Sequence, residues 1–127
     1  MFLTVLQVAL GGGIGASGRF LTGVAMSRTF GMQPFPLGVI TVNILGSFIM
    51  GVLVTFLGHK GLTHWNAFLA MGVLGGFTTF SSFSLETWTL IDRGKVGLAA
   101  VYVALSVVFS LIGLMAGVYL MRGVLVQ

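Results

Sequence analysis

Apolar residues fill four long stretches of this chain, at residues 3–26, 37–57, 65–90 and 96–121. Each stretch holds about 20 residues or more, the length that an α-helix needs to cross the hydrocarbon core of a bilayer. Polar breaks at residues 27–36, 58–61 and 92–95 carry the glycines and prolines typical of turns. The pattern predicts an all-α integral membrane protein in which residues 1–127 form a single domain of four transmembrane helices.

The third stretch differs from the other three because a polar run lies in its middle. Residues 75–84 read Gly-Gly-Phe-Thr-Thr-Phe-Ser-Ser-Phe-Ser. An unsatisfied polar group in hydrocarbon costs roughly 2–7 kcal/mol, so such a run must face protein or a watery path. Phe80 and Phe83 share one helical face, interleaved with Thr79, Ser81 and Ser82. Packing alone explains two phenylalanines at this spacing, but it does not explain the hydroxyls between them.

Composition supports a membrane protein, since 57% of the 127 residues are hydrophobic and only 6% are charged. A typical soluble domain is about 25% charged. The N-terminal stretch has no basic start and extends beyond signal-peptide length, so we interpret it as the first spanning helix. The six basic residues are dispersed, which argues against a nucleic-acid partner.

The charges in the loops hardly favour either orientation of the chain in the membrane. With four spans, Lys60 and Arg122 lie on one side, and Arg28, Arg93 and Lys95 lie on the other. The positive-inside rule needs a clear excess of Lys and Arg on one side. The chain either inserts both ways, which permits an antiparallel pair, or has a modest bias that places the Arg28 side in the cytoplasm.

Two glycine patterns indicate close helix packing. Residues 13–18 fit G-x-G-x-x-G, but the acidic residue that a dinucleotide site needs about 20 positions later is missing. Gly11 and Gly15 are four residues apart, as are Gly72 and Gly76, and small residues at this spacing let membrane helices approach closely.

Polar residues at membrane depth are candidates for function. Asn43 lies in the second stretch, where its amide either bridges helices or faces a ligand. Tyr102, Ser106 and Ser110 are spaced four residues apart and form one stripe on the fourth helix. Each of these hydroxyls has the alternative of bonding back to its own helix.

Charged residues within the spans are few. Arg19 is the one cation inside the first stretch, although it can snorkel, and Glu86 follows Ser82 by one turn. The other polar groups within the predicted spans are an amide, hydroxyls and the positive edges of aromatic rings, all of which favour anions. We therefore expect anion passage. Catalysis is not expected, because His59 and His64 lie in or beside a loop without a carboxylate or cysteine.

The motif at residues 75–84, followed by Glu86, resembles the third-helix signature of the Fluc (CrcB) fluoride channels. The Gly-rich start with Arg19, the Pro-Leu-Gly at 36–38 and the Val-Asn-Ile-Leu-Gly at 42–46 also fit, so the resemblance covers nearly the whole chain. It implies an antiparallel homodimer in the inner membrane of a prokaryote, which exports fluoride passively through two pores at the dimer interface.

The resemblance also implies roles for individual residues. Phe80, Phe83 and Asn43 match the family's pore residues, and Tyr102, Ser106 and Ser110 match its polar track. Ser81 and Ser82 accompany the pore residues, and polar support is expected from a further group: Arg19, Thr41, Thr79 and Glu86. A helix break at residues 75–78 implies a structural sodium ion held by the backbone carbonyls of Gly75 and Thr78.

The chain departs from the family pattern at one position. The family commonly has Gly-Thr-Leu where this chain has Gly38-Val39-Ile40, so the hydroxyl is absent or has moved to Thr41.

Two other classes of protein are compatible with four short spans. A proton-coupled multidrug transporter needs a carboxylate in its first helix, where this chain has Arg19 instead. A structural subunit of a larger complex would explain the glycines but not the stripes of hydroxyls.

Overall fold

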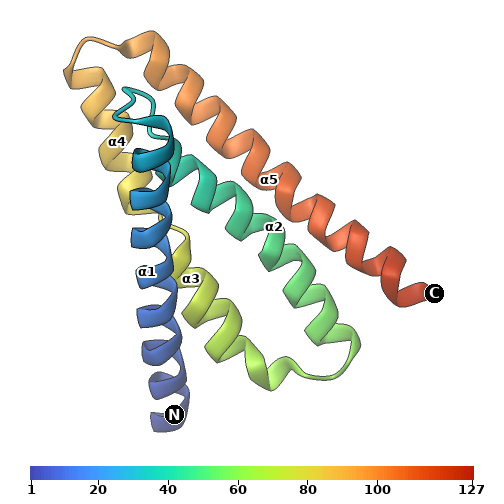
Figure 1. The fold of residues 1–127 in the computed structure, drawn as a ribbon. Helices are drawn as coiled ribbons and strands as arrows, with labels where there is room; N and C mark the ends of the chain where they lie inside the picture. Colours follow the sequence, from blue (N-terminus) through green and yellow to red (C-terminus); the bar gives the residue numbers. More distant parts are fainter.

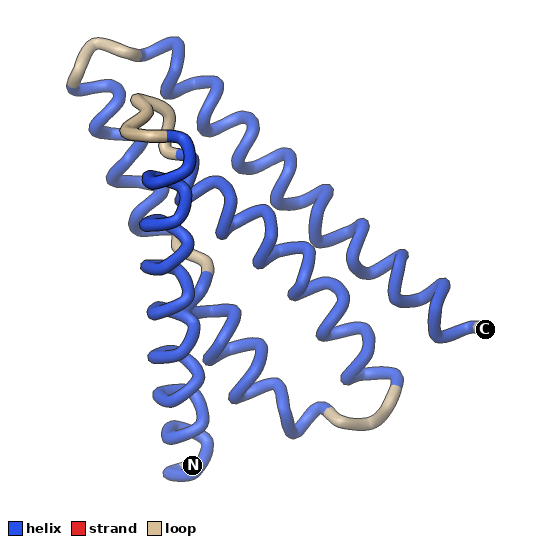
Figure 2. Tube along the Cα trace, viewed as in Figure 1, coloured by secondary structure: helices blue, strands red, loops and turns tan.

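The structure is a computed structural model that describes residues 1–127, and it contains helices and short connections but no strand. The long helices α1 (Phe2–Phe30), α2 (Leu37–His59) and α5 (Val96–Val126) flank a composite third helix (Figures 1 and 2). The parts of that third helix are η1 (Thr63–Trp65), η2 (Ala67–Leu74), α3 (Gly75–Phe77) and α4 (Phe80–Asp92). The predicted all-α architecture is confirmed, and the helices extend beyond the predicted stretches by up to five residues.

Each connection turns at a glycine. Gly31, Gly61 and Gly94 have φ of 76°, 69° and 78°, in the left-handed region that glycine adopts without steric cost. They lie in the three predicted breaks. The amide N–H of Gly31 also donates to the carbonyl of Ser27, which closes the last turn of α1.

Three helical segments are long and apolar enough to cross a membrane, judged by length and composition: Leu37–His59, Thr63–Asp92 and Val96–Val126. The α1 helix is long enough at 29 residues but less apolar, since it includes Gln7, Ser17, Arg19 and Arg28. Three of the four predicted spans therefore have the expected length and hydropathy. The remaining one, α1, is confirmed as a helix.

The helices form two pairs. The α1 helix runs beside η2 and α3, while α2 runs beside α5, and the pairs diverge toward the end that carries the N-terminus (Figure 1). At the opposite end, α4 packs beside α5. The η2 segment is a π-helix, a form that is frequent at functional sites.

A seam of glycines joins α1 to the third helix, as the small-residue spacing predicts. A Cβ on Gly11 or Gly15 would collide with the carbonyl of Phe68 or Val73, respectively. A Cβ on Gly72 would lie 2.9 Å from the Cα of Gly11, and one on Gly76 would lie 2.5 Å from the carbonyl oxygen of Gly12. The two backbones are in direct contact, so no other residue fits at these positions.

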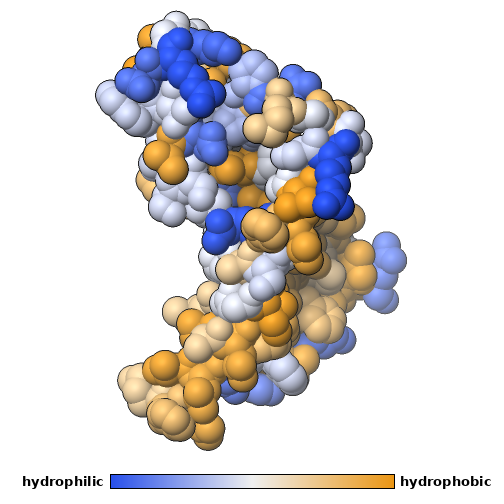
Figure 3. Space-filling model, turned by 60° about the vertical axis from the view of Figure 1, so that its left-hand side comes forward, coloured by the Kyte–Doolittle hydropathy of each residue, from blue (hydrophilic) through white to orange (hydrophobic).

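Little of the chain is buried within the subunit. Only 15 of 127 residues are buried, and the core cluster consists of Ile40, Leu90, Ala99 and Tyr102. Hydrophilic side chains gather at the end that carries the α1–α2 and α4–α5 connections, and apolar side chains cover much of the remaining visible face (Figure 3). The exposed apolar surface needs a cover of lipid or another protein chain.

Candidate functional site

The helix break lies at Thr78 and Thr79. Their backbone is extended, with φ and ψ of −84° and 160° at Thr78 and of −154° and 121° at Thr79. Gly75 is still helical, with φ of −62° and ψ of −36°. The predicted break in the third helix is therefore confirmed, but its position is corrected from residues 75–78 to Thr78 and Thr79, so the chain unwinds at threonines and not at the glycines.

Asn43 holds this break from α2. Its Nδ2 donates to the carbonyl of Thr79 at 3.0 Å, and its Oδ1 accepts from the amide N–H of Thr79 at 2.8 Å. These two bonds replace the helical bonds that an extended residue loses inside a membrane. The amide therefore bridges two helices, and one of its two N–H groups remains for a further acceptor.

Other side chains also satisfy the backbone around the break. Nε of Arg19 donates to the carbonyl of Gly76 at 3.1 Å, so Arg19 supports the end of α3 from α1. Oγ1 of Thr79 accepts from the amide N–H of Ser82 at 3.1 Å, which caps the start of α4. Arg19 and Thr79 thus donate to or accept from the backbone on the two sides of the break.

Two carbonyls at the break, those of Gly75 and Thr78, lose their helical donors. The amide N–H of Thr79 donates to Asn43 instead of Gly75, and the amide N–H of Ser82 donates to the Thr79 side chain instead of Thr78. Gly75 also lies at the surface of the chain. Backbone carbonyls that lose their donors inside a membrane need other partners.

An open pocket of about 460 Å³, which we call the groove, lies beside the break. Its polar lining comes from α2, the break and α5: Asn43, Ser47, Thr78, Thr79, Ser106 and Ser110. Its aromatic lining comes from Phe80 and Phe83 on α4, whose ring centroids are 5.6 Å apart. Phe80 is 79% exposed although it is apolar, so this edge of the groove is open in the single subunit.

The hydroxyl stripe of α5 reaches the groove. Ser106 and Ser110 line it, and the fully buried Tyr102 ring packs on Phe83 at a centroid distance of 5.2 Å. The hydroxyls of Tyr102 and Ser106 are buried and have no hydrogen-bond partner. They do not bond back to their own helix. Ser106 lines the groove, whereas Tyr102 lines neither the groove nor the larger pocket described below, so only the Ser106 hydroxyl is a free donor at the groove itself.

Some predicted residues lie outside the groove. The hydroxyl of Ser81 is exposed and pairs with that of Thr79 at 3.3 Å, and Ser82 contributes its backbone to the cap. Thr41 lines neither the groove nor the larger pocket described next. Ser47 does line the groove, and its spacing of four residues from Asn43 is the signal that identifies it.

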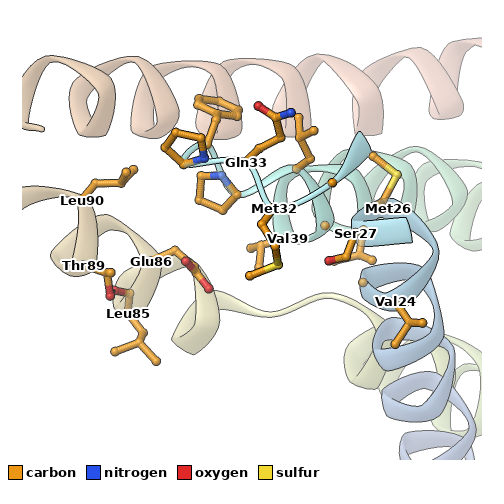
Figure 4. Close-up of a pocket in the computed structure, with 18 of the residues that line it drawn as sticks. Val24, Met26, Ser27, Met32, Gln33, Val39, Leu85, Glu86, Thr89 and Leu90 are labelled. Atoms are coloured by element: carbon orange, nitrogen blue, oxygen red, sulfur yellow. The ribbon is translucent and has the colours of Figure 1, made fainter. Parts of the chain in front are cut away.

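A larger pocket of about 910 Å³, which we call the vestibule, opens between α1, the α1–α2 connection and α4. Its charged residues are Arg19, Arg28, Arg93 and Glu86. Glu86 extends from α4 into the space that faces Met32 and Val39 (Figure 4). Val39 lines the vestibule where a threonine is expected, and Thr41 does not replace that hydroxyl.

Comparisons with known proteins cover nearly the whole chain. Residues 6–118 match the family model described as CrcB-like protein, Camphor Resistance (CrcB). The chain is 56% identical over 125 residues to the fluoride-specific ion channel FluC of Ruegeria sp. (strain TM1040), covering 98% of this chain and 99% of that protein.

Two further relatives have the same description. The fluoride-specific ion channel FluC of Cereibacter sphaeroides (strain ATCC 17029 / ATH 2.4.9) is 58% identical over 123 residues, or 97% of this chain and 98% of the relative. That of Rhodospirillum centenum (strain ATCC 51521 / SW) is 50% identical over 120 residues, or 93% of this chain and 94% of the relative.

Proposed function

The chain belongs to the CrcB-like family, and from that premise we propose that it is a fluoride-selective channel, which lets fluoride leave the cell passively across the inner membrane of a prokaryote. The observation that carries the proposal is the groove, where the Asn43 amide, two α5 serines and two phenylalanines converge at membrane depth. A channel of this kind is not an enzyme.

The chemistry of the groove suits a small, strongly hydrated anion. A selectivity filter works by replacing the hydration shell of the ion with groups of the protein. The free N–H of Asn43 and the hydroxyls of Ser106 and Ser110 are neutral donors in the groove. We add to them the buried, unpaired hydroxyl of Tyr102, whose ring packs on Phe83. Ring edges of Phe80 and Phe83 add positive electrostatic potential without a full charge that would trap the anion.

A second subunit is needed to complete the groove. Phe80 is mostly exposed, and the lipid-exposed wall of the groove would leave an anion against hydrocarbon. We expect four membrane spans, with α1 crossing beside η2 and α3 because the glycine seam holds it along them. The near balance of loop charges supports an antiparallel homodimer, whose two subunits line two pores at their interface.

The break also fits a structural sodium ion. Carbonyl oxygens are hard ligands suited to such a cation, and those of Gly75 and Thr78 lose their helical donors. In an antiparallel dimer that meets at this surface, the Gly75 and Thr78 carbonyls of both subunits would hold the cation. Its positive charge would stabilise the dimer and the nearby anion.

Reconstitution tests the proposal directly. Liposomes that are loaded with fluoride and contain only the purified protein should release fluoride, which a fluoride-selective electrode detects. Liposomes loaded with chloride should not release chloride. Protein-free liposomes are the control for leakage. Absence of fluoride release from a protein that elutes as a folded dimer would refute the proposed function.

A further inference from the structure

Phe35 is an aromatic residue that neither the groove nor the sequence motifs include. It lies in the α1–α2 connection between Pro34 and Pro36, and it lines the vestibule. Because proline fixes φ and restricts the residue before it, the backbone on both sides of Phe35 is stiff. A loop side chain held in this way is able to fix the position of its neighbour.

That neighbour is Tyr102. The Phe35 ring stands edge to face with the Tyr102 ring, at a centroid distance of 5.4 Å and an interplanar angle of 89°. Phe83 packs on the same tyrosine at 5.2 Å, and Phe80 follows at 5.6 Å from Phe83. The four rings form a continuous series from the vestibule to the groove, with Tyr102 in the interior.

Tyr102 is held by packing alone. Its side chain is 0% exposed, and its hydroxyl has no hydrogen-bond partner that would orient it. Its ring belongs to the core cluster, against which Phe35 packs from the α1–α2 connection and Phe83 packs from α4. Edge-to-face contact restricts a ring more tightly than aliphatic contact does, because the aromatic quadrupole favours particular orientations.

We infer that Phe35 is a positioning residue for permeation, which holds the buried Tyr102 ring and, through it, the Phe83 ring that lines the groove. The inference rests on the proposed function, since it assigns Phe83 to the anion path. It adds the α1–α2 connection to the machinery of the channel, although this connection contributes nothing to the groove itself.

Flux measurements give the first test. Phe35→Leu keeps an apolar side chain but removes the ring, and the loss of one aromatic contact should lower fluoride flux about three- to tenfold. Phe35→Tyr keeps a ring at this position and should conduct like the parent. Phe30→Leu is the matched control, because Phe30 ends α1, is 52% exposed and does not line the vestibule.

A spectroscopic readout separates positioning from a general loss of stability. The chain has two tyrosines, so Tyr119→Phe protein labelled with 3-fluorotyrosine reports on Tyr102 alone. Its fluorine resonance should be single and sharp, should broaden or split in Phe35→Leu, and should not change in Phe30→Leu.

Two results would overturn the inference: parental flux in Phe35→Leu, or reduced flux with an unchanged Tyr102 resonance. A parent protein that conducts no fluoride would instead refute the proposed function, while the resonance would still show whether Phe35 orders Tyr102.

Discussion

The glycine seam and the groove lie on two sides of the same helix break and are built in opposite ways. In the seam, α1 contacts η2 and α3 through backbone atoms, and no space remains for a Cβ at Gly11, Gly15 or Gly72. In the groove, side chains line an open volume of about 460 Å³, and the buried hydroxyl of Ser106 has no partner. Backbone contacts fill the seam, whereas the groove stays open.

This difference teaches which parts of the chain serve stability and which serve function. Natural proteins rarely leave buried donors unpaired, because each costs about 1–3 kcal/mol. The hydroxyls of Tyr102 and Ser106 on α5, like Oδ1 of Asn66, are therefore groups that a ligand or another partner would stabilise. The seam holds the break rigidly on one side, so that the groove on the other side keeps its shape without a ligand.

The largest effect is expected in the seam. Gly15→Ala places a Cβ against the carbonyl of Val73 and 2.8 Å from the amide nitrogen of Phe77, so the two backbones must separate. We expect the free energy of unfolding to fall by about 3 kcal/mol or more, at the upper end of overpacking effects. Size-exclusion chromatography should then show little folded protein. Gly13→Ala is the matched control, since its Cβ meets nothing within 4 Å. Equal yields of the two variants would contradict the seam.

Asn43 both lines the groove and holds the helix break, so its substitution tests the two roles together. Asn43→Asp keeps the acceptor for the amide of Thr79, but it removes the donor to the Thr79 carbonyl and adds a negative charge to the groove. Loss of one donor to a dehydrated ion costs about 1.5–3 kcal/mol, and repulsion adds to this, so fluoride flux should vanish. If Asn43→Asp conducts like the parent, the amide is only a helix bridge. Ser47→Ala, one turn away in the groove, should reduce flux far less.

The phenylalanines should affect conduction and not folding. Phe80 is 79% exposed and Phe83 faces the groove, so Phe80→Ile and Phe83→Ile remove ring edges from the proposed path while keeping apolar volume. We expect fluoride flux to fall by about tenfold or more, while each variant elutes as a dimer. Parental flux in both variants would remove these rings from the path.

The smallest effect concerns the hydroxyl of Ser106, which is unpaired within the subunit. Ser106→Ala removes a buried donor without breaking a bond, so thermal stability should stay the same or rise. Fluoride flux should fall a few-fold, because a donor to the anion is lost. A drop in thermal stability with unchanged flux would mean that this hydroxyl has a structural partner in the dimer.

Local patterns in the sequence predict the parts of this molecule that local interactions determine. The helices follow from apolar runs of bilayer length, the connections from Gly31, Gly61 and Gly94, and the seam from glycines four residues apart. The Ser106 and Ser110 stripe reaches the groove because a spacing of four residues keeps one helical face.

Features that depend on contacts between residues distant in the sequence are harder to predict from the sequence alone. The glycine pair suggests unwinding at Gly75, but the chain unwinds at Thr78 and Thr79, where Asn43 supplies replacement hydrogen bonds from another helix. Phe35 has no periodic neighbours in its loop, so no sequence pattern connects it with Tyr102.

If an antiparallel partner completes the groove, fluoride flux depends on the presence of both subunit orientations in one membrane. Two lysines added at residues 58–61 should bias insertion one way, and two added at residues 92–95 should bias it the other way. The measurement is fluoride efflux from cells or membranes that express each biased form alone or both together. We expect that each form alone is inactive and that co-expression restores flux. Full flux from a population shown by labelling to have a single orientation would contradict it.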